Sequence, residues 1–237
     1  MLHLLLGRAK TGKTTRLYQA MRENGKHRPQ VLIVPEQYSH EAERRLCQEL
    51  GGGASAWAEV LSFTRLYHRV LTETGGLAQP MLDGGGQLLL MHQAVHAVSS
   101  QLTLYAKPSK KAAFLEHLLA TRGELKSYCI QPQQLIEAGD NAPEGEGQRL
   151  RELGLILACY DTLTQRLAAD PRDRLTQLAE RLKTCEYGRG ADFYLDSFVD
   201  FTPQQRQVLT QLMSKAPSVP VALTCDTLNN DSLEVFA

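Results

Sequence analysis

Apolar residues follow two patterns along this chain, short continuous runs and stripes at helical spacing. The continuous runs are residues 2–6, 31–34, 60–61, 193–195 and 219–224. Each predicts a strand, and we expect the first to be buried. The segments between them carry apolar residues at helical spacing and end at glycines. This alternation predicts an α/β fold, in which helices cover the faces of a parallel sheet.

The pattern changes after Pro80, where helical periodicity continues without a strand-like run. The predicted helices are residues 87–100, 110–126, 132–138, 149–168 and 171–184. Their apolar stripes are more typical of a core than of a binding surface. Residues 139–147, rich in glycine and acidic side chains, predict an exposed loop. We therefore expect a discontinuous α/β domain, residues 1–80 and 188–237, interrupted by an all-helical insertion at residues 81–187.

The first predicted strand leads into a glycine-rich segment that opens a helix. Its sequence, Gly-Arg-Ala-Lys-Thr-Gly-Lys-Thr at residues 7–14, fits the P-loop pattern, although an ordinary glycine-rich turn is the alternative. Loop amides and the helix amino terminus would face phosphate oxygens. Lys13 would reach the β- and γ-phosphates of ATP, and Thr14 would ligate Mg²⁺. The candidate nucleotide-binding residues are Gly7, Arg8, Ala9, Lys10, Thr11, Gly12, Lys13, Thr14 and Thr15.

Composition narrows the function classes. The chain has 26 basic and 26 acidic residues, so any DNA contact must be local rather than driven by a global basic field. Its five cysteines are scattered and show no CxxC spacing, which favours reduced thiols in a cytoplasmic protein. No apolar run approaches the length of a membrane span, and we expect no membrane partner.

A P-loop site needs a second acid to hold the metal's water shell. Asp196 is the candidate, because it follows the predicted strand at residues 193–195. Together Thr14 and Asp196 would hold Mg²⁺ through nucleotide and water, whereas a simple strand-end cap is the alternative for Asp196. The next residue is Ser197, where hydrolysing P-loop proteins usually carry a glutamate that orients water. The sequence therefore assigns no catalytic residue.

These motifs carry a resemblance to a known family. Residues 195–200 (Leu-Asp-Ser-Phe-Val-Asp) resemble the Asp-Glu-Phe-Gln-Asp motif of superfamily 1 UvrD-like DNA helicases, with Ser197 in place of the glutamate. The closer resemblance is to the B subunit of bacterial AddAB-type helicase–nucleases. It rests on residues 7–14, 34–37, 61–66, 70–76, 128–130, 196–198 and 201–204, which occur in matching order.

This resemblance implies a fold and a set of partners. The fold would be a RecA-like superfamily 1 helicase domain 1A with an inserted 1B-like helical subdomain. The partners would be single-stranded DNA, a helicase–nuclease A subunit and the remaining carboxy-terminal part of a longer chain. That part would carry a second helicase-like half, which supplies arginines to the ATP site, and a nuclease domain with an iron–sulfur cluster. None of the five cysteines here is assigned to the cluster.

The resemblance also implies DNA contacts in two loops and in the motif after Asp196. The candidates are Gln37, Ser39, Phe63, Arg65, His68 and Phe198. Aromatic faces stack on bases, arginine pairs with phosphate, and glutamine can read a base edge. The alternative is that Phe63 and Phe198 are core residues and Arg65 a solvated helix start. Ser39 could also cap the following helix, and the γ-phosphate sensor would correspond to Asn229.

We therefore expect the amino-terminal part of a B subunit that acts in double-strand break repair by recombination. It would bind ATP and single-stranded DNA, including a regulatory hotspot sequence, without being a competent motor alone. Two rivals stay open: a small-molecule P-loop kinase whose helical insertion supplies the acceptor site, and a DNA-binding module with a vestigial P-loop.

Overall fold

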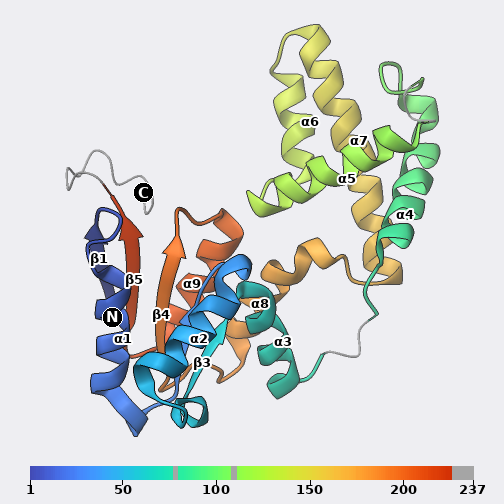
Figure 1. Ribbon diagram of the computed structural model, residues 1–237. Coiled ribbons are helices and arrows are strands. Elements are labelled where there is room, and N and C mark those ends of the chain that lie inside the picture. The colour runs from blue at the N-terminus through green and yellow to red at the C-terminus, as the bar shows by residue number, and fades with distance from the viewer. Residues whose placement is uncertain (77–79, 108–110, 226–237) are drawn as a thin grey trace. The chain divides into compact units, whose positions relative to one another are not determined.

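The computed structural model describes residues 1–76, 80–107 and 111–225 and shows an α/β protein (Figure 1). Five strands form one parallel sheet in the order β1-β5-β4-β2-β3. The strands are β1 (Leu2–Gly7), β2 (Gln30–Ile33), β3 (Ala58–Leu61), β4 (Asp192–Phe198) and β5 (Val219–Thr224). They lie where the apolar runs predicted them, so the predicted α/β class with a parallel sheet is confirmed.

The burial expected of the first strand is wrong. Leu2 and Leu4 in β1 are 39% and 40% exposed. Within the described residues β1 pairs only with β5, so it forms an edge of the sheet. A continuous apolar run indicates a strand, but it does not reveal how many neighbours the strand has. The central strand β4 shows the contrast, because Phe193, Tyr194 and Leu195 are completely buried.

The chain divides into two compact units, one formed by Met1–Leu77 and Leu175–Ala237 and the other by Ala78–Arg174. The first holds the sheet. Its described helices are α1 (Lys13–Asn24), α2 (Ser39–Leu50), α3 (Phe63–Thr74), α8 (Arg174–Thr184) and α9 (Pro203–Lys215). The boundary between the units falls after Arg174, the first residue of α8. One side of its core joins Leu17 and Met21 of α1 to Leu46 of α2 and to Leu32 and Tyr194 of the sheet.

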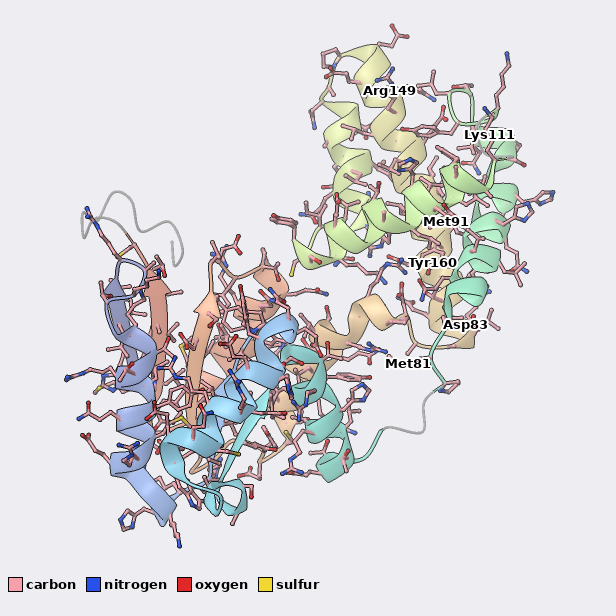
Figure 2. The ribbon with its side chains drawn as sticks, in the orientation of Figure 1. Met81, Asp83, Met91, Lys111, Arg149 and Tyr160 are labelled. Carbon is pink, nitrogen blue, oxygen red and sulfur yellow. The ribbon has the colours of Figure 1, made fainter. Side chains whose placement is uncertain are left out.

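The second unit contributes no strand to the sheet in its described part. Its helices are α4 (Gly84–Ala97), α5 (Ala112–Ser127), α6 (Pro132–Asp140) and α7 (Glu144–Leu167). Asp83 caps α4 by accepting a 2.7 Å hydrogen bond from the Gly86 amide. Met91 of α4 and Tyr160 of α7 are fully buried in one apolar cluster, and Figure 2 labels both within this unit.

The loop predicted at residues 139–147 is largely helical. Helix α6 continues to Asp140 and α7 begins at Glu144. The glycines serve helix packing instead: a Cβ on Gly147 would lie 2.3 Å from the Gly139 carbonyl oxygen, and one on Gly154 would lie 2.6 Å from Ile136. Glycine therefore lets α6 and α7 approach closely, a role that the sequence pattern does not distinguish from loop formation.

Two further properties of the described residues bear on function. None of their helices combines the length and the apolar character that crossing a bilayer requires. All five cysteines are free thiols, so no disulfide bond cross-links the described residues.

Candidate nucleotide-binding site

The turn between β1 and α1 has the backbone geometry of a tight glycine-dependent loop. Gly12 precedes the first residue of α1 and adopts φ 88°, in the left-handed region that glycine tolerates best. At Gly7 the restriction is steric, because a Cβ would lie 2.8 Å from Thr11 Oγ1. Both glycines of the predicted motif are therefore required by the local structure.

The loop is braced by its own side chains. Lys13 Nζ donates to the carbonyl oxygens of Gly7 at 2.8 Å and Arg8 at 2.7 Å. Thr11 Oγ1 donates to the Arg8 carbonyl at 2.8 Å. These bonds fix the ammonium group of Lys13 beside the loop at the amino terminus of α1, where helix N–H groups have no partner within the helix. The loop thus concentrates positive charge and amide donors.

Asp196 reaches this loop from the far part of the chain. It lies near the carboxyl end of β4, where the register with β5 shifts between Leu195 and Phe198. Asp196 is 7% exposed, and the Thr14 side chain interacts with its carboxyl group. Burial raises the pKa of the Asp196 carboxyl above its usual value, and Thr14, the Ser197 backbone, Arg45 and Lys13 oppose that rise only in part. The two predicted magnesium-holding residues therefore lie close enough to interact.

Arg45 joins the same group, although no sequence motif indicated it. Its Nη2 donates to Thr15 Oγ1 at 3.2 Å, and its guanidinium carbon lies 5.2 Å from the ring centroid of Tyr18. The signal available in the sequence was its place on α2, beside the buried face marked by Leu46. A cation here lies next to the P-loop threonines and favours an anionic ligand.

Ser197 differs sharply from its neighbour Asp196. Its side chain is exposed, and its backbone adopts φ 65°, a left-handed conformation that is uncommon for residues other than glycine. Ser197 thus lies within the register shift of β4, exposed to solvent and next to the buried Asp196.

The aromatic candidates for DNA stacking are buried. Phe63 and Phe198 pack edge to face with ring centroids 5.7 Å apart, and Phe201 lies 4.8 Å from Phe198. Phe63 is 7% exposed and Phe198 8% exposed, so their ring faces are not available at the surface. Their placement matches the alternative of core residues.

The polar candidates follow the carboxyl ends of β2 and β3. Gln37, Arg65 and His68 are exposed, and Arg65 forms an ion pair with Glu43 of α2. The cap expected of Ser39 is wrong, because Ser39 is the first residue of α2 and its buried Oγ has no hydrogen-bond partner in the described residues. Ser62 caps α3 instead, accepting from the Arg65 amide at 3.2 Å. The proposed sensor Asn229 lies outside the described residues.

Comparisons with a family model and with known proteins identify the same family. The family model described as "ADDB, N-terminal" matches residues 4–237. A protein of Thermoanaerobacter sp. (strain X514), named as the B subunit of an ATP-dependent helicase/deoxyribonuclease, is 35% identical over 237 residues, covering 98% of this chain and 20% of the relative. A protein of the same name from Geobacillus kaustophilus is 33% identical over 244 residues, covering 98% of this chain and 21% of the relative.

A third relative with that name, from Caldanaerobacter subterraneus subsp. tengcongensis, is 31% identical over 229 residues, covering 95% of this chain and 20% of the relative. This chain therefore spans about a fifth of the length of the curated relatives that it matches. The match to the family model extends over nearly the entire sequence, from β1 to the last residue. The chain belongs to the family of AddB amino-terminal regions.

Proposed function

We propose that this chain binds ATP with Mg²⁺ at the P-loop, as the helicase-like amino-terminal part of a helicase–nuclease B subunit. The observation that carries the proposal is the interaction of Thr14 with the buried carboxyl of Asp196. P-loop NTPases hold Mg²⁺ with a threonine or serine of the loop and a Walker-B aspartate. Thr14 and Asp196, which are far apart in sequence, would take these two roles here.

The donor set suits magnesium. A hydroxyl and a carboxylate are the hard oxygen ligands that Mg²⁺ prefers, and phosphate and water oxygens complete its octahedral shell. In the described part of the chain no group of three or more His, Cys, Asp or Glu side chains gathers to hold a metal unaided. A metal carried in by the nucleotide therefore fits this site better than a permanently bound ion.

The sheet order supports the finer assignment of a RecA-like domain 1A. Strand β5 lies between the P-loop strand β1 and the Asp196 strand β4. In this proposal the helical unit is an inserted subdomain of the 1B type within a discontinuous domain. The sequence placed this insertion at residues 81–187, whereas the compact helical unit is Ala78–Arg174 and α8 belongs to the sheet-bearing unit. Ligands of parallel α/β sheets bind at the carboxyl ends of the strands, where Gly7 and Asp196 lie.

Single-stranded DNA would bind at the same end of the sheet. Gln37 and His68 are exposed beside it, and Arg65 can exchange its ion pair with Glu43 for a phosphate. Ser39 is a weaker candidate, because its hydroxyl is buried. We leave the buried Phe63 and Phe198 out of the proposed contact surface.

The relatives' name, the B subunit of a helicase/deoxyribonuclease, suggests the wider setting. The proposed partners are a helicase–nuclease A subunit and further parts of the same polypeptide, with an iron–sulfur cluster held outside these residues. The proposed process is repair of double-strand breaks by recombination in the bacterial cytoplasm. Hotspot recognition by this half would use the DNA surface described above.

The central test is nucleotide binding by Lys13→Ala. Titration calorimetry with MgATP should detect binding by the wild-type chain and a loss of at least about tenfold in the variant, because a charge-assisted phosphate contact is removed. Lys183→Ala, which removes an exposed lysine on α8, is the matched control and should bind like wild type. Far-UV circular dichroism should show that both variants keep the fold. Equal binding by Lys13→Ala and wild type would refute the site.

The DNA surface is tested separately with Arg65→Ala and fluorescence anisotropy of a labelled single-stranded oligonucleotide. We expect weaker binding and a shallower salt dependence, because one phosphate contact is lost. Arg189→Ala is the control, since Arg189 is also an exposed arginine in an ion pair. If the two variants bind DNA equally well, Arg65 does not contact the strand.

Ser197 leads us to propose that the chain is not a motor by itself. A serine hydroxyl is a poor general base, so the water-orienting function of the usual glutamate is missing. Purified chain should show no DNA-stimulated ATP hydrolysis. Ser197→Glu should not restore it, because the arginines expected from a second helicase-like half lie outside these residues. A turnover of about one per second, within the range of ordinary enzymes, would contradict this proposal.

A further inference from the structure

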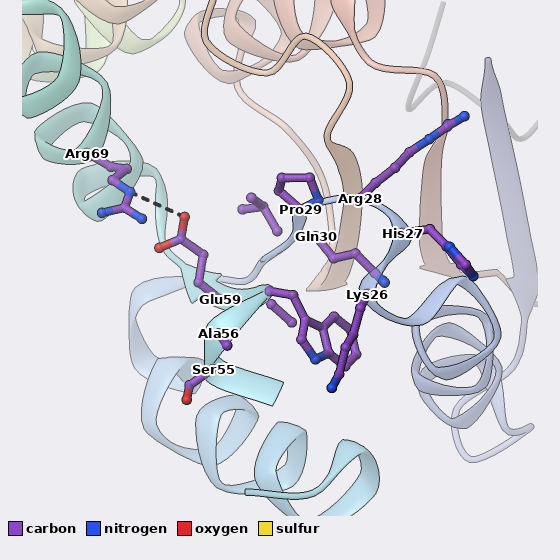
Figure 3. Close-up of a pocket in the computed structure, with 12 residues that line it drawn as sticks. Lys26, His27, Arg28, Pro29, Gln30, Ser55, Ala56, Glu59 and Arg69 are labelled. Atoms are coloured by element: carbon purple, nitrogen blue, oxygen red, sulfur yellow. Dashed lines mark ion pairs between the residues drawn. The ribbon is translucent and has the colours of Figure 1, made fainter. Parts of the chain in front are cut away.

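A pocket of about 330 Å³ lies at the amino ends of β2 and β3 (Figure 3), whereas the P-loop follows the carboxyl end of β1. It is formed by the first residues of β2 and β3 and the residues that lead into them, among them Lys26, Gln30, Trp57 and Glu59, with Arg69 from α3. All of these residues belong to the sheet-bearing unit. The volume is within the range of about 300–1,000 Å³ that is usual for small-molecule sites.

Gln30, which lines the pocket, carries an unused hydrogen-bond acceptor. Its side-chain Nε2 donates to the carbonyl oxygens of Met21 at 3.1 Å and Gly25 at 2.7 Å, and its backbone amide donates to the Trp57 carbonyl at 2.8 Å. These bonds hold the amide in one orientation. The residue is 1% exposed, yet its Oε1 has no hydrogen-bond partner in the described residues. Buried polar atoms are nearly always bonded, so this oxygen calls for a donor.

The charges around the pocket leave Lys26 as an available cation. Arg69 is engaged by two carboxylates, Glu59 at 3.4 Å and Glu73 at 3.2 Å. Arg28 lies 3.9 Å from Asp192 and points away from Lys26 in Figure 3. Lys26 is exposed at the pocket and forms no ion pair with any described residue. Its ammonium group can therefore bind an anion.

Trp57 supplies the third element, a half-buried aromatic side chain in the pocket wall. Aromatic faces stack well on nucleobases, and this stacking tolerates every base. We propose that the pocket binds a nucleoside phosphate, with the base against Trp57, a base N–H donating to Gln30 Oε1 and the phosphate at Lys26. The same chemistry is present in a free nucleotide and in one unit of a single DNA strand.

An acidic peptide fits this pocket less well. Recognition of a run of carboxylates needs several available cations, whereas Arg28 and Arg69 already face carboxylates. A buried acceptor, an aromatic face and the Lys26 ammonium group match a single planar base carrying a single phosphate. This inference is independent of the proposed function, because it involves no residue of the P-loop.

The test uses the intrinsic fluorescence of Trp57, which is the single tryptophan of the chain and reports on this pocket directly. Titration with deoxyadenosine monophosphate should quench the signal and reach saturation. Lys26→Ala should weaken the apparent affinity about tenfold, as expected for a lost charge-assisted bond. Lys183→Ala, the matched exposed-lysine control, should leave it unchanged. Lys13→Ala should also leave it unchanged, which separates this pocket from the P-loop.

Further ligands distinguish the sources of the nucleotide and the alternatives. A short oligodeoxyadenylate that binds more tightly than the monophosphate, with the same Lys26 dependence, would identify a DNA strand as the source, and the reverse order would identify a free nucleotide. Inorganic phosphate should compete at least about tenfold more weakly than the monophosphate. Three results would overturn the proposal: no saturable quenching, equal competition by phosphate, or binding of an oligoglutamate peptide in place of the nucleotide.

Discussion

Charged side chains are buried both at the carboxyl end of the sheet and inside the helical unit. The two regions differ in how completely these charges are paired. At the sheet, burial raises the pKa of Asp196, and the Thr14 side chain, the Ser197 backbone and two nearby cations offset this only in part. In the helical unit, Glu152 is 1% exposed and accepts from Thr103, Leu104, Tyr105 and Gln148. Burial would raise the pKa of Glu152, but these bonds outweigh it and lower the value to about 2.

The same contrast holds for the cations. Lys126 of α5 is buried and donates to Asp170 at 2.9 Å and to Asp173 at 2.8 Å. Arg122 holds Asp161 with two bonds, of 3.0 and 2.6 Å. Lys13, in contrast, donates to two backbone carbonyl oxygens, and it offsets the raised pKa of Asp196 only in part. Charges with complete partner sets serve structure, whereas a buried carboxyl whose raised pKa is not fully offset by nearby cations is typical of a binding site.

The largest expected effect is at Lys126. Lys126→Met should lower the free energy of unfolding of the helical unit by about 3–5 kcal/mol, because Asp170 and Asp173 would lose their buried cation. Hydrogen exchange of α5, measured by mass spectrometry, resolves this unit from the sheet. The matched variant Lys13→Met should change stability by less than about 1 kcal/mol, because Lys13 forms no ion pair with a described acid and its effect on the Asp196 carboxyl is the smallest of those that lower that pKa. Similar losses in both variants would abolish the distinction between the two regions.

Glu152 predicts a pH dependence of known sign. Its folded-state pKa of about 2 is below the usual 4.5, so its stabilisation is complete above pH 4.5 and is lost as the pH falls toward 2. The difference corresponds to about 3 kcal/mol at neutral pH. Glu152→Gln should therefore reduce hydrogen-exchange protection of residues 103–107 at pH 7, with the gap to wild type closing as the pH falls toward 2. Glu124→Gln, at an exposed position of α5, should show no such gap at any pH.

Asp196→Asn should separate stability from binding. Above its raised pKa the buried carboxylate is held ionised against the cost of burial, so an amide should leave stability equal or higher at pH 7. Magnesium-dependent ATP binding should fall about 10–100-fold, as for other outer-shell metal partners. Urea denaturation measures the change in stability. Calorimetry with MgATP and with ATP in EDTA measures the change in magnesium-dependent binding. A marked loss of stability would make Asp196 a structural cap instead.

The sequence predicted the sheet and the tight turn after β1 well, because both depend on local patterns. Apolar runs located all five strands of the described sheet, and the glycine-rich motif located the turn that leads from β1 into α1. The exposure of β1 could not be predicted, because strand order is set by contacts distant in sequence. The burial of Phe63 and Phe198 has the same origin, since the two rings come from distant parts of the chain.

Arg45 and the pocket at Trp57 were missed for a related reason. Neither belongs to a motif, and each depends on a packing arrangement that periodicity does not specify. Glycine was ambiguous as well: at Gly12 it serves a left-handed turn, and at Gly147 it serves close helix contact. Residue type alone cannot separate these two uses.

The smallest effect concerns two strained backbone positions, one in each region. Ser197 has φ 65° and Cys129 has φ 59°, and Cys129 closes helix α5 with bonds from its own amide to Lys126 and from the Ile130 amide to Leu125. An L-residue in the left-handed conformation costs about 1–2 kcal/mol, and glycine avoids this cost. Glycine also loses more conformational entropy on folding, which offsets about 0.5–1 kcal/mol of the gain. Cys129→Gly and Ser197→Gly should each therefore stabilise their unit by up to about 1 kcal/mol in denaturation followed by hydrogen exchange.

The two variants should differ in MgATP binding. Cys129→Gly should leave this binding unchanged, whereas Ser197→Gly should weaken it, because added backbone freedom beside Asp196 loosens the carboxylate that interacts with Thr14. Unchanged MgATP binding by Ser197→Gly would mean that strain at the sheet end, like that at Cys129, belongs only to the fold.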